Sequence, residues 1–464
     1  MKSQHDPEGA RLPIKVDSTS NGEFQPLPLP RLAREANRLA QEHASENARR
    51  AGMDRREFLV SACGAASTLL AFNTANAMGG KAGGFFALSS ESAVDPVLAG
   101  QELAQREFIF DVQGHFIGSH ALRAGDPRGR QNFLKDVFLD SDTDMMVLSF
   151  VPSRRDSEPL TIEQADEVRR IVGELEGTQR LLLHGRVNPN QAGDVDGMDE
   201  LAEEYGVVAW KTYTQWGPEG RGFYLSDADT GIPFIEKARA LGIKVICVHK
   251  GIPFGRQSYE HSLCDDIGVV AKRFPDVDFI IYHSGWVPGQ AERAHDLDAN
   301  RDGVDSLVRS LIGNEVAPNS NVYAELGSTW RGVMSDPDSS AHTIGKLLKH
   351  VGEDNVVWGT DSIWYGSPQD QIQAFRTFQI SEEYRERYGY PEITTALRAK
   401  IFGLNATRPY NISAEEVLER TSNDVISRQR LAYRDHPDPH FLTFGPKTRR
   451  EFLQLLKLHG GTPV

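Results

Sequence analysis

The sequence predicts an α/β fold: one (β/α)8 TIM barrel with an N-terminal signal or extension and a short C-terminal helical tail. Three observations support this prediction. Eight short apolar runs recur between residues 105 and 412, and helical patterns separate several of them. No glycine-rich phosphate-binding loop follows any of the runs, which weakens the alternative of an open nucleotide-binding sheet.

The eight runs are short, rich in β-branched or aromatic residues and nearly continuous in apolarity. This pattern is typical of parallel strands that are buried on both faces. The predicted strands are residues 108–112, 145–150, 180–187, 207–213, 244–248, 278–282, 321–326 and 355–359. The clearest helices are predicted at residues 162–175, 233–241, 267–274 and 341–351. The predicted barrel therefore occupies residues 105–412, and residues 413–464 form a C-terminal helical extension.

The composition is that of an ordinary globular protein. Hydrophobic residues make up 39% of the chain and charged residues 25%, and the formal net charge is −14. Because nucleic-acid binding requires a basic surface, we expect a small-molecule substrate and no nucleic-acid partner. A short amphipathic helix at residues 449–458 leaves homo-oligomerisation open as an alternative to capping of the barrel.

Three segments precede the predicted barrel. Residues 1–52 are predicted to form a polar, mobile extension with some helix, and residues 78–104 are predicted to form a linker. Between them, residues 53–77 resemble a twin-arginine signal peptide. Arg55 and Arg56 stand before an apolar run that is too short to span a membrane, and Ala75-Asn76-Ala77 fits a cleavage site. We therefore expect the twin-arginine export machinery as a partner and a periplasmic or extracellular location. The true start could be Met1 or Met53.

Polar side chains follow the ends of four predicted strands. Gln113 and His115 follow the first strand, His249 the fifth, His283 the sixth and Asp361 the eighth. The carboxyl ends of the strands form the active site of a barrel. A single histidine there is ordinarily structural, but repeated imidazole and carboxylate groups favour a divalent first-row metal ion.

Further polar and aromatic residues are candidates for substrate binding. His184 lies on the third strand, Lys211 on the fourth and Glu325 on the seventh. Lys211 could bind a substrate anion or form a salt bridge with Glu325, and the sequence leaves both alternatives open. Tryptophans also fall just beyond strand ends, namely Trp216, Trp286, Trp330 and Trp364. They could line a pocket for a cyclic substrate or pack loops onto the barrel.

Five segments resemble the amidohydrolase-related (amidohydrolase-2) family of metal-dependent barrels. They are FDVQGH at residues 110–115, CVHKG at 247–251, the stretch 274–285 that ends in YHSG, WGTDS at 358–362 and IFGLNA at 401–406. The resemblance covers roughly residues 107–412. The five segments occur in the order expected for the family, which makes the resemblance specific.

The resemblance implies that His115, His249 and Asp361 are metal ligands and that His283 is a ligand or a catalytic acid/base. The sequence departs from the family at Gln113, where histidine is common and some decarboxylating relatives have glutamate. Since an amide oxygen is a weaker ligand than imidazole or carboxylate, we expect one divalent ion. Zn²⁺ is the expected ion, with Mn²⁺ as the alternative, and Gln113 or a water completes its coordination.

These residues predict a metal-dependent hydrolase that acts on an amide, lactone or ester bond of a small, sometimes cyclic molecule. Asp361 would take a proton from water, and His283 would polarise the carbonyl group. One alternative is non-oxidative decarboxylation of a hydroxylated aromatic acid by the same residues. Another is a non-enzymatic binding protein on the same scaffold, an alternative that Gln113 favours.

Overall fold

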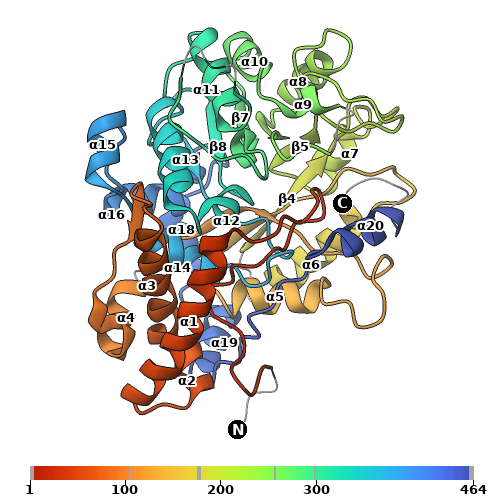
Figure 1. Cartoon of the computed structure of the whole chain (residues 1–464). Coiled ribbons are helices and arrows are strands. Elements are labelled where there is room, and N and C mark those ends of the chain that lie inside the picture. The colour runs from red at the N-terminus through yellow and green to blue at the C-terminus, as the bar shows by residue number, and fades with distance from the viewer. Residues whose placement is uncertain are drawn as a thin grey trace.

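The computed structural model describes residues 5–104, 107–174, 179–254, 258–296, 299 and 301–458, and its centre is an eight-stranded parallel barrel (Figure 1). The strands are β2 (Phe110–Gly114), β3 (Met145–Leu148), β4 (Leu181–Arg186), β5 (Ala209–Tyr213), β6 (Val245–His249), β7 (Asp278–Tyr282), β8 (Val322–Glu325) and β9 (Val356–Val357). They pair in sequence order, each with the next. Each overlaps a predicted strand, so the predicted fold is confirmed.

The barrel closes between β2 and the chain that follows β9. The backbone N–H of Val112 donates to the carbonyl of Trp358 at 3.0 Å, and that of Asp361 donates to the carbonyl of Gln113 at 3.0 Å. A parallel bridge between Gly114 and Ser362 completes the seam. The seam therefore brings the polar ends of the first and last strands side by side.

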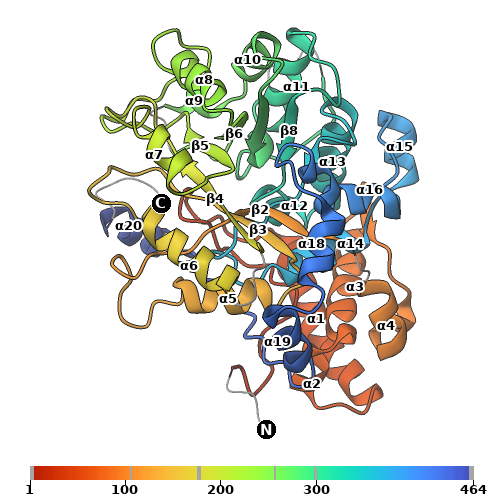
Figure 2. The ribbon, with the colours of Figure 1, turned by 180° about the vertical axis from the view of Figure 1, so that it is seen from behind.

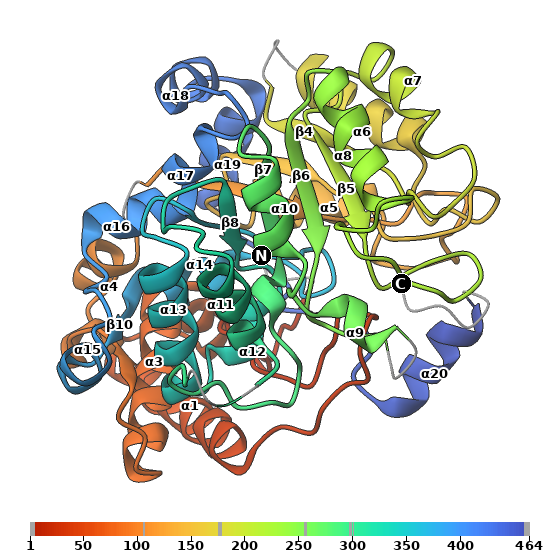
Figure 3. The ribbon, with the colours of Figure 1, turned by 90° about the horizontal axis from the view of Figure 1, so that it is seen from above.

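Helices surround the barrel, as the views from behind and from above show (Figures 2 and 3). They are α5 (Arg130–Phe138), α6 (Ile162–Glu174), α7 (Met198–Glu203), α8 (Gly231–Ala240), α9 (Tyr259–Ser262), α10 (Ile267–Arg273), α11 (Val304–Gly313), α12 (Thr329–Val333), α13 (Pro337–His350) and α14 (Gln369–Thr377). Local sequence signals set their limits. For example, Asp336 caps the first turn of α13 and Pro337 occupies its first position.

The N-terminal residues form a helical layer against one side of the barrel (lower left in Figure 1). Its helices are α1 (Arg31–Arg50), α2 (Arg55–Val60), α3 (Ala62–Met78) and α4 (Pro96–Leu103), and β1 (Gly84–Phe86) pairs with β10 (Phe378–Ile380) in a small antiparallel sheet. The buried face of α1 is mostly alanine, which lets α3 approach closely. This layer contains residues 53–77, the predicted signal peptide.

The two arginines of the predicted signal contact other parts of the folded chain. Arg55 donates to the carbonyl of Gly9 at 2.9 Å, whereas Arg56 is buried, donates to the carbonyl of Pro439 and lies 3.5 Å from the carboxylate of Asp438. No helix in the described part of the chain is long and apolar enough to cross a membrane. Export by the twin-arginine route stays a prediction.

The segment before α1 is packed against the barrel. Leu12, Ile14 and Val16 are buried among apolar side chains, and residues 19–23 are buried as well. The prediction of a mobile polar tail is therefore wrong for this stretch. Its charged and polar side chains find partners on the barrel: Lys15, for example, forms an ion pair with Asp370 at 3.2 Å.

The chain after β10 is largely helical, and from residue 413 on it forms the predicted helical extension. Its helices are α15 (Glu382–Tyr388), α16 (Thr395–Ala399), the short π-helix η3 (Lys400–Leu404), α17 (Asn405–Thr407), α18 (Ala414–Thr421), α19 (Val425–Arg434) and α20 (Arg449–Leu458). The stretch between α19 and α20 runs beside the N-terminal segment. Thr19 and Thr443 share a hydrogen bond of 2.8 Å, and Ser20 N–H donates to the carbonyl of Pro446 at 3.0 Å.

Candidate metal centre

The carboxyl ends of β2, β6 and β7 and the turn after β9 bring together most of the polar residues predicted from the sequence. Gln113, His115, His249, His283 and Asp361 are all at most 3% exposed. They form two contacting groups within one buried site. The predicted convergence of strand ends is therefore found in the fold.

The first group joins β2 to the turn after β9. The carboxylate oxygen Oδ1 of Asp361 accepts from Gln113 Nε2 at 3.0 Å and lies 3.2 Å from His115 Nε2. The other oxygen, Oδ2, accepts from Asn21 Nδ2 at 2.9 Å and from the Ser328 hydroxyl. Burial alone would raise the pKa of Asp361, but the hydrogen bonds from His115 and Ser328 and the nearby imidazoles hold it below its usual value.

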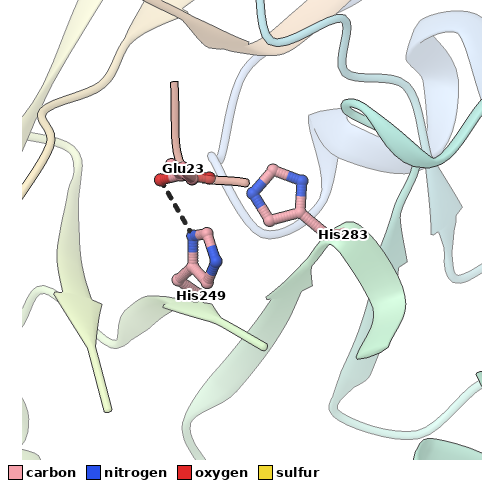
Figure 4. Close-up of side chains that lie close together, drawn as sticks. All are labelled: Glu23, His249 and His283. Carbon is pink, nitrogen blue, oxygen red and sulfur yellow. Dashed lines mark ion pairs between the residues drawn. The ribbon is translucent and has the colours of Figure 1, made fainter. Parts of the chain in front are cut away.

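The second group consists of His249, His283 and Glu23 (Figure 4). One ligand atom from each of the three side chains lies within 4.8 Å of the others. Glu23 Oε1 is 3.6 Å from His249 Nδ1, and the two imidazole centroids are 4.4 Å apart. Burial lowers the pKa of both histidines, that of His283 to about 4. Both imidazoles are therefore neutral at pH 7, the form that binds metal ions.

The orientation of His283 is fixed by groups from β8 and the turn that follows it. Its Nδ1 lies 2.6 Å from the carbonyl oxygen of Gly327, so Nδ1 carries the proton and the lone pair is on Nε2. Its backbone N–H donates to Glu325 Oε2 at 3.0 Å. Glu325 therefore positions His283, and Nε2 of His283 is suited to be a ligand or a base.

Glu23 and Asn21 are site residues that the sequence did not predict. Asn21 links the two groups, because its Nδ2 donates to Asp361 at 2.9 Å and to Glu23 Oε2 at 2.6 Å. Neither residue belongs to a periodic pattern or follows a strand. No local sequence signal distinguishes Glu23 from the other acidic residues of the extension.

Carboxyl groups outnumber amines in this buried region. Glu23, Glu325 and Asp361 lie there with one amine, that of Lys211. The Lys211 amine lies 3.5 Å from the centroid of the Tyr282 ring and has no hydrogen-bond partner among the described residues. The salt bridge with Glu325, one of the two predicted roles of Lys211, is not formed. Burial lowers the pKa of Lys211 to about 8 and raises that of Glu325 to about 8.

Two of the predicted substrate-binding residues lie away from the two groups. His184 Nε2 is 3.1 Å from the Tyr410 hydroxyl and 3.5 Å from Cys247 Sγ, inside the barrel core. Trp330 packs against Phe375 in the outer layer of helices, with ring centroids 5.1 Å apart.

Two other predicted tryptophans lie nearer to the site. Trp364 has its ring centroid 6.3 Å from that of His115. Trp286 contacts Phe24, next to Glu23 in sequence, with centroids 6.2 Å apart. Tyr213 at the end of β5 stacks on His249 at 4.5 Å between centroids. Aromatic side chains therefore border the polar site.

The side chains fit a divalent cation. Several buried atoms suited to metal binding have no hydrogen-bond partner among the described residues, namely Gln113 Oε1, both nitrogens of His249 and Nε2 of His283. Unpartnered buried polar atoms are costly, and a cation would satisfy them together with the excess of carboxylates. Nitrogen and oxygen ligands without cysteine are typical of a catalytic site for Zn²⁺ or a similar ion.

The model of the family described as Amidohydrolase matches residues 111–412, which is more than half of the chain. The chain therefore belongs to the amidohydrolase family, a family of metal-dependent enzymes, as the five sequence segments indicated. The match begins at the second residue of β2 and ends before α18, so it contains all of the barrel strands except Phe110 and excludes Asn21 and Glu23. No curated protein sequence matches the chain.

Solved structures with a similar barrel include three enzymes. The 2,6-dihydroxybenzoate decarboxylase from Rhizobium is 15% identical, with 66% of this chain and 99% of that chain covered and a TM-score of 0.40. A putative 2-pyrone-4,6-dicarboxylic acid hydrolase from Pseudomonas putida is 15% identical, with 66% and 98% covered and a TM-score of 0.40. The 5-carboxyvanillate decarboxylase from Novosphingobium aromaticivorans, solved with manganese, is 13% identical, with 68% and 97% covered and a TM-score of 0.42.

Proposed function

We propose that this protein is a metal-dependent hydrolase that cleaves an amide, lactone or ester bond in a small molecule. One observation carries the proposal: in a buried site, unpartnered ligand atoms of His249 and His283 lie close to one another, and His283 is near enough to the carboxylate of Asp361 to interact with it electrostatically. When bound, a divalent ion supplies Lewis acidity that acidifies water and polarises a carbonyl group. Zn²⁺ is the proposed ion, with Mn²⁺ as the alternative.

Asp361 is the proposed general base. Its carboxylate is held by hydrogen bonds on both oxygens, and its pKa lies below the usual value, so it is ionised at neutral pH. An ionised carboxylate fixed in one orientation can accept a proton from water and pass it to a leaving group. His283 presents an Nε2 lone pair, so it either binds the ion or accepts a proton from the substrate side.

The borders of the site favour a small substrate with a flat face. Tyr213 and Phe254 pack against His249, and Trp364 lies beyond His115. Aromatic walls around a few polar groups are typical of small-molecule sites. The unpartnered amine of Lys211 could attract an anionic substrate group, which remains its other predicted role.

Non-oxidative decarboxylation of a hydroxylated aromatic acid is the second candidate. It is favoured by Gln113, which stands where the family commonly has a histidine and so supports one metal ion in place of two. A decarboxylase would use the same ion to hold the substrate and a protonated side chain to donate to the ring carbon. The two reactions differ in their products.

Metal content and product analysis test these candidates. Purified protein is expected to contain about one divalent ion per chain by elemental analysis, as its three or four nitrogen and oxygen ligands indicate. The loaded protein is then given cyclic lactones, esters, amides and hydroxybenzoic acids in ¹⁸O-labelled water. Hydrolysis places ¹⁸O in the product, whereas decarboxylation releases CO₂. A protein that binds neither Zn²⁺ nor Mn²⁺ would contradict both and support the binding-protein alternative.

A further inference from the structure

A short N-terminal segment, residues 19–24, reaches into the site from outside the barrel. Ser20 is anchored to the carbonyl of Pro446, and Phe24 contacts Trp286. Between these anchors Asn21 and Glu23 are buried, and the Glu23 side chain is only 4% exposed. The segment is therefore packed in place on both sides of Glu23.

The carboxylate of Glu23 faces two imidazoles that have ring nitrogens without a hydrogen-bond partner (Figure 4). Its Oε1 is 3.6 Å from His249 Nδ1, and its Oε2 accepts from Asn21 at 2.6 Å. His283 presents its unpartnered Nε2 to the same space, and the three ligand atoms lie within 4.8 Å of one another. These spacings resemble those between neighbouring ligands of one ion more than those of a hydrogen-bonded network.

The one amine near Glu23 in the described part of the chain, that of Lys211, is shared with Glu325 and Asp361. Asp361 is near enough to repel Glu23, and Asn21, a neutral residue, donates to both carboxylates. Placing two carboxylates together in a buried site is unfavourable unless a cation lies between or beside them. A segment that only filled the mouth of the barrel would gain stability from a neutral side chain at this position.

We propose that Glu23 is a ligand of the metal centre together with His249 and His283, supplied by the N-terminal segment and not by the barrel. It would restore the anionic donor that Gln113, an uncharged amide, does not provide. The inference rests on the proposed function only in that both require a bound divalent ion. It makes the N-terminal extension a part of the active site.

Metal binding to four full-length proteins tests the proposal: wild type, Glu23→Gln, Glu23→Asp and Asp17→Asn. Each is stripped with a chelator and titrated with Zn²⁺ against a chromophoric chelator, and the visible spectrum of the Co²⁺ form is recorded. Asp17 is the matched control, because its carboxylate lies two residues before this segment but pairs with Arg331 at 3.0 Å. Glu23→Gln is expected to weaken Zn²⁺ binding by at least roughly 10–100-fold, the loss seen even for residues one step removed from a metal.

Glu23→Asp is expected to bind Zn²⁺ more tightly than Glu23→Gln and to shift the Co²⁺ spectrum, whereas Asp17→Asn keeps the wild-type affinity and spectrum. If Glu23→Gln does not fold, Glu23→Asp alone decides through its spectrum. Unchanged affinity and spectrum in the Glu23 variants would overturn the proposal. Faster turnover with unchanged affinity would also overturn it, since the segment would then be an inhibitory plug.

The proposed function can fail separately from this inference. A wild-type protein that binds Zn²⁺ through Glu23 but neither hydrolyses nor decarboxylates any substrate would leave the inference standing and remove the function. A wild-type protein that hydrolyses substrate, together with a Glu23→Gln variant of full metal affinity, would leave the proposed function standing and remove the inference.

Discussion

At the scale of single residues, the backbone of the site is held in an unusual conformation. His283, Ser328 and Asp361 have positive φ angles of 62°, 53° and 57°. Such a conformation costs a non-glycine residue about 1–3 kcal/mol and persists only where surrounding contacts impose it. Here the N–H of Asp361 is held by the carbonyl of Gln113, and that of His283 by Glu325. The strained turns therefore fix where the side chains point.

Replacing Asp361 with asparagine is expected to abolish turnover while leaving the barrel folded. An amide cannot accept the proton, and loss of a general base costs roughly 10²–10⁴-fold in rate. The amide still offers one oxygen to Gln113 or His115, so the hydrogen-bonded seam is kept. The check is kcat on the identified substrate, with metal content and melting temperature measured alongside. Near-normal kcat would mean that the assigned site is not the catalytic one.

The sequence could predict the strand-end residues but not all of their neighbours. His249 and His283 could be predicted because the carboxyl ends of parallel strands converge. Glu23 could not, since a non-periodic polar segment carries no signal of what it packs against. The sequence also predicts His184 as a substrate-binding residue, but His184 is in register with Ala209, two residues before the Arg186–Lys211 pair, and so lies deeper in the barrel.

At the scale of elements, buried strands were easier to predict than the N-terminal helices. The eight strands have continuous apolar runs, and the structure places each within a few residues of its prediction. In contrast, α1 has a face of alanines such as Ala36 and Ala40. This face is only weakly apolar, so the sequence predicts a helix here but supports partial disorder nearly as well. Its packing depends on α3, a partner that the local sequence of α1 does not reveal.

Helix α13 is expected to make the metal-free protein sensitive to acid. Burial, with Lys346 nearby, lowers the pKa of His342 to about 4, and burial lowers that of His350 to about 4. The unfolded chain takes up these protons near pH 6.5, before the folded chain does. The contribution of these two histidines to the free energy of unfolding is therefore fully present above pH 6.5. It is lost as the pH falls toward 4, by up to about 1.4 kcal/mol per pH unit for each histidine.

Urea unfolding of metal-free wild type and His342→Gln at pH 7, 6 and 5 tests this. Glutamine does not titrate but can still contact the Tyr390 hydroxyl, which lies 3.0 Å from His342 Nδ1. The variant is expected to lose less stability between pH 7 and 5 than the wild type. The histidines of the site titrate equally in both proteins, so their effect cancels when the losses of stability of the two proteins are compared. Equal losses would show that His342 does not contribute.

At the scale of the whole molecule, the extension and the barrel form one folded unit. The predicted signal residues lie in α2 and α3, where Phe58 and Leu69 are fully buried. Cleavage after residue 77 would remove these helices together with Asn21 and Glu23. We propose that the chain, if exported by the twin-arginine route to the periplasm or outside the cell, keeps its extension and travels folded.

Targeting and retention are tested separately. A reporter fused to residues 1–80 is expected to cross the membrane only when Arg55 and Arg56 are intact, and export of the Arg55→Lys, Arg56→Lys form would indicate another route. The intact mass of the full-length protein purified from its own cells is expected to include residues 1–77. A mass that begins at residue 78, with metal affinity unchanged, would argue against a role for the extension.

The contact between Asn21 and Asp361 spans 340 residues of sequence, and that between Arg56 and Pro439 spans 383. A ribosome adds about 5–20 residues per second, so in each pair the later residue is synthesised roughly 20–70 s after the earlier one. During that time the early chain has no barrel to pack on, and we propose that its arginine pair is then open to a targeting receptor. Synthesis of the last barrel strand and of Asp361 completes the polar site, and synthesis of residues 438–439 then buries Arg56. The timing of synthesis would thus let the N-terminal extension serve first as a targeting signal and later as part of the active site.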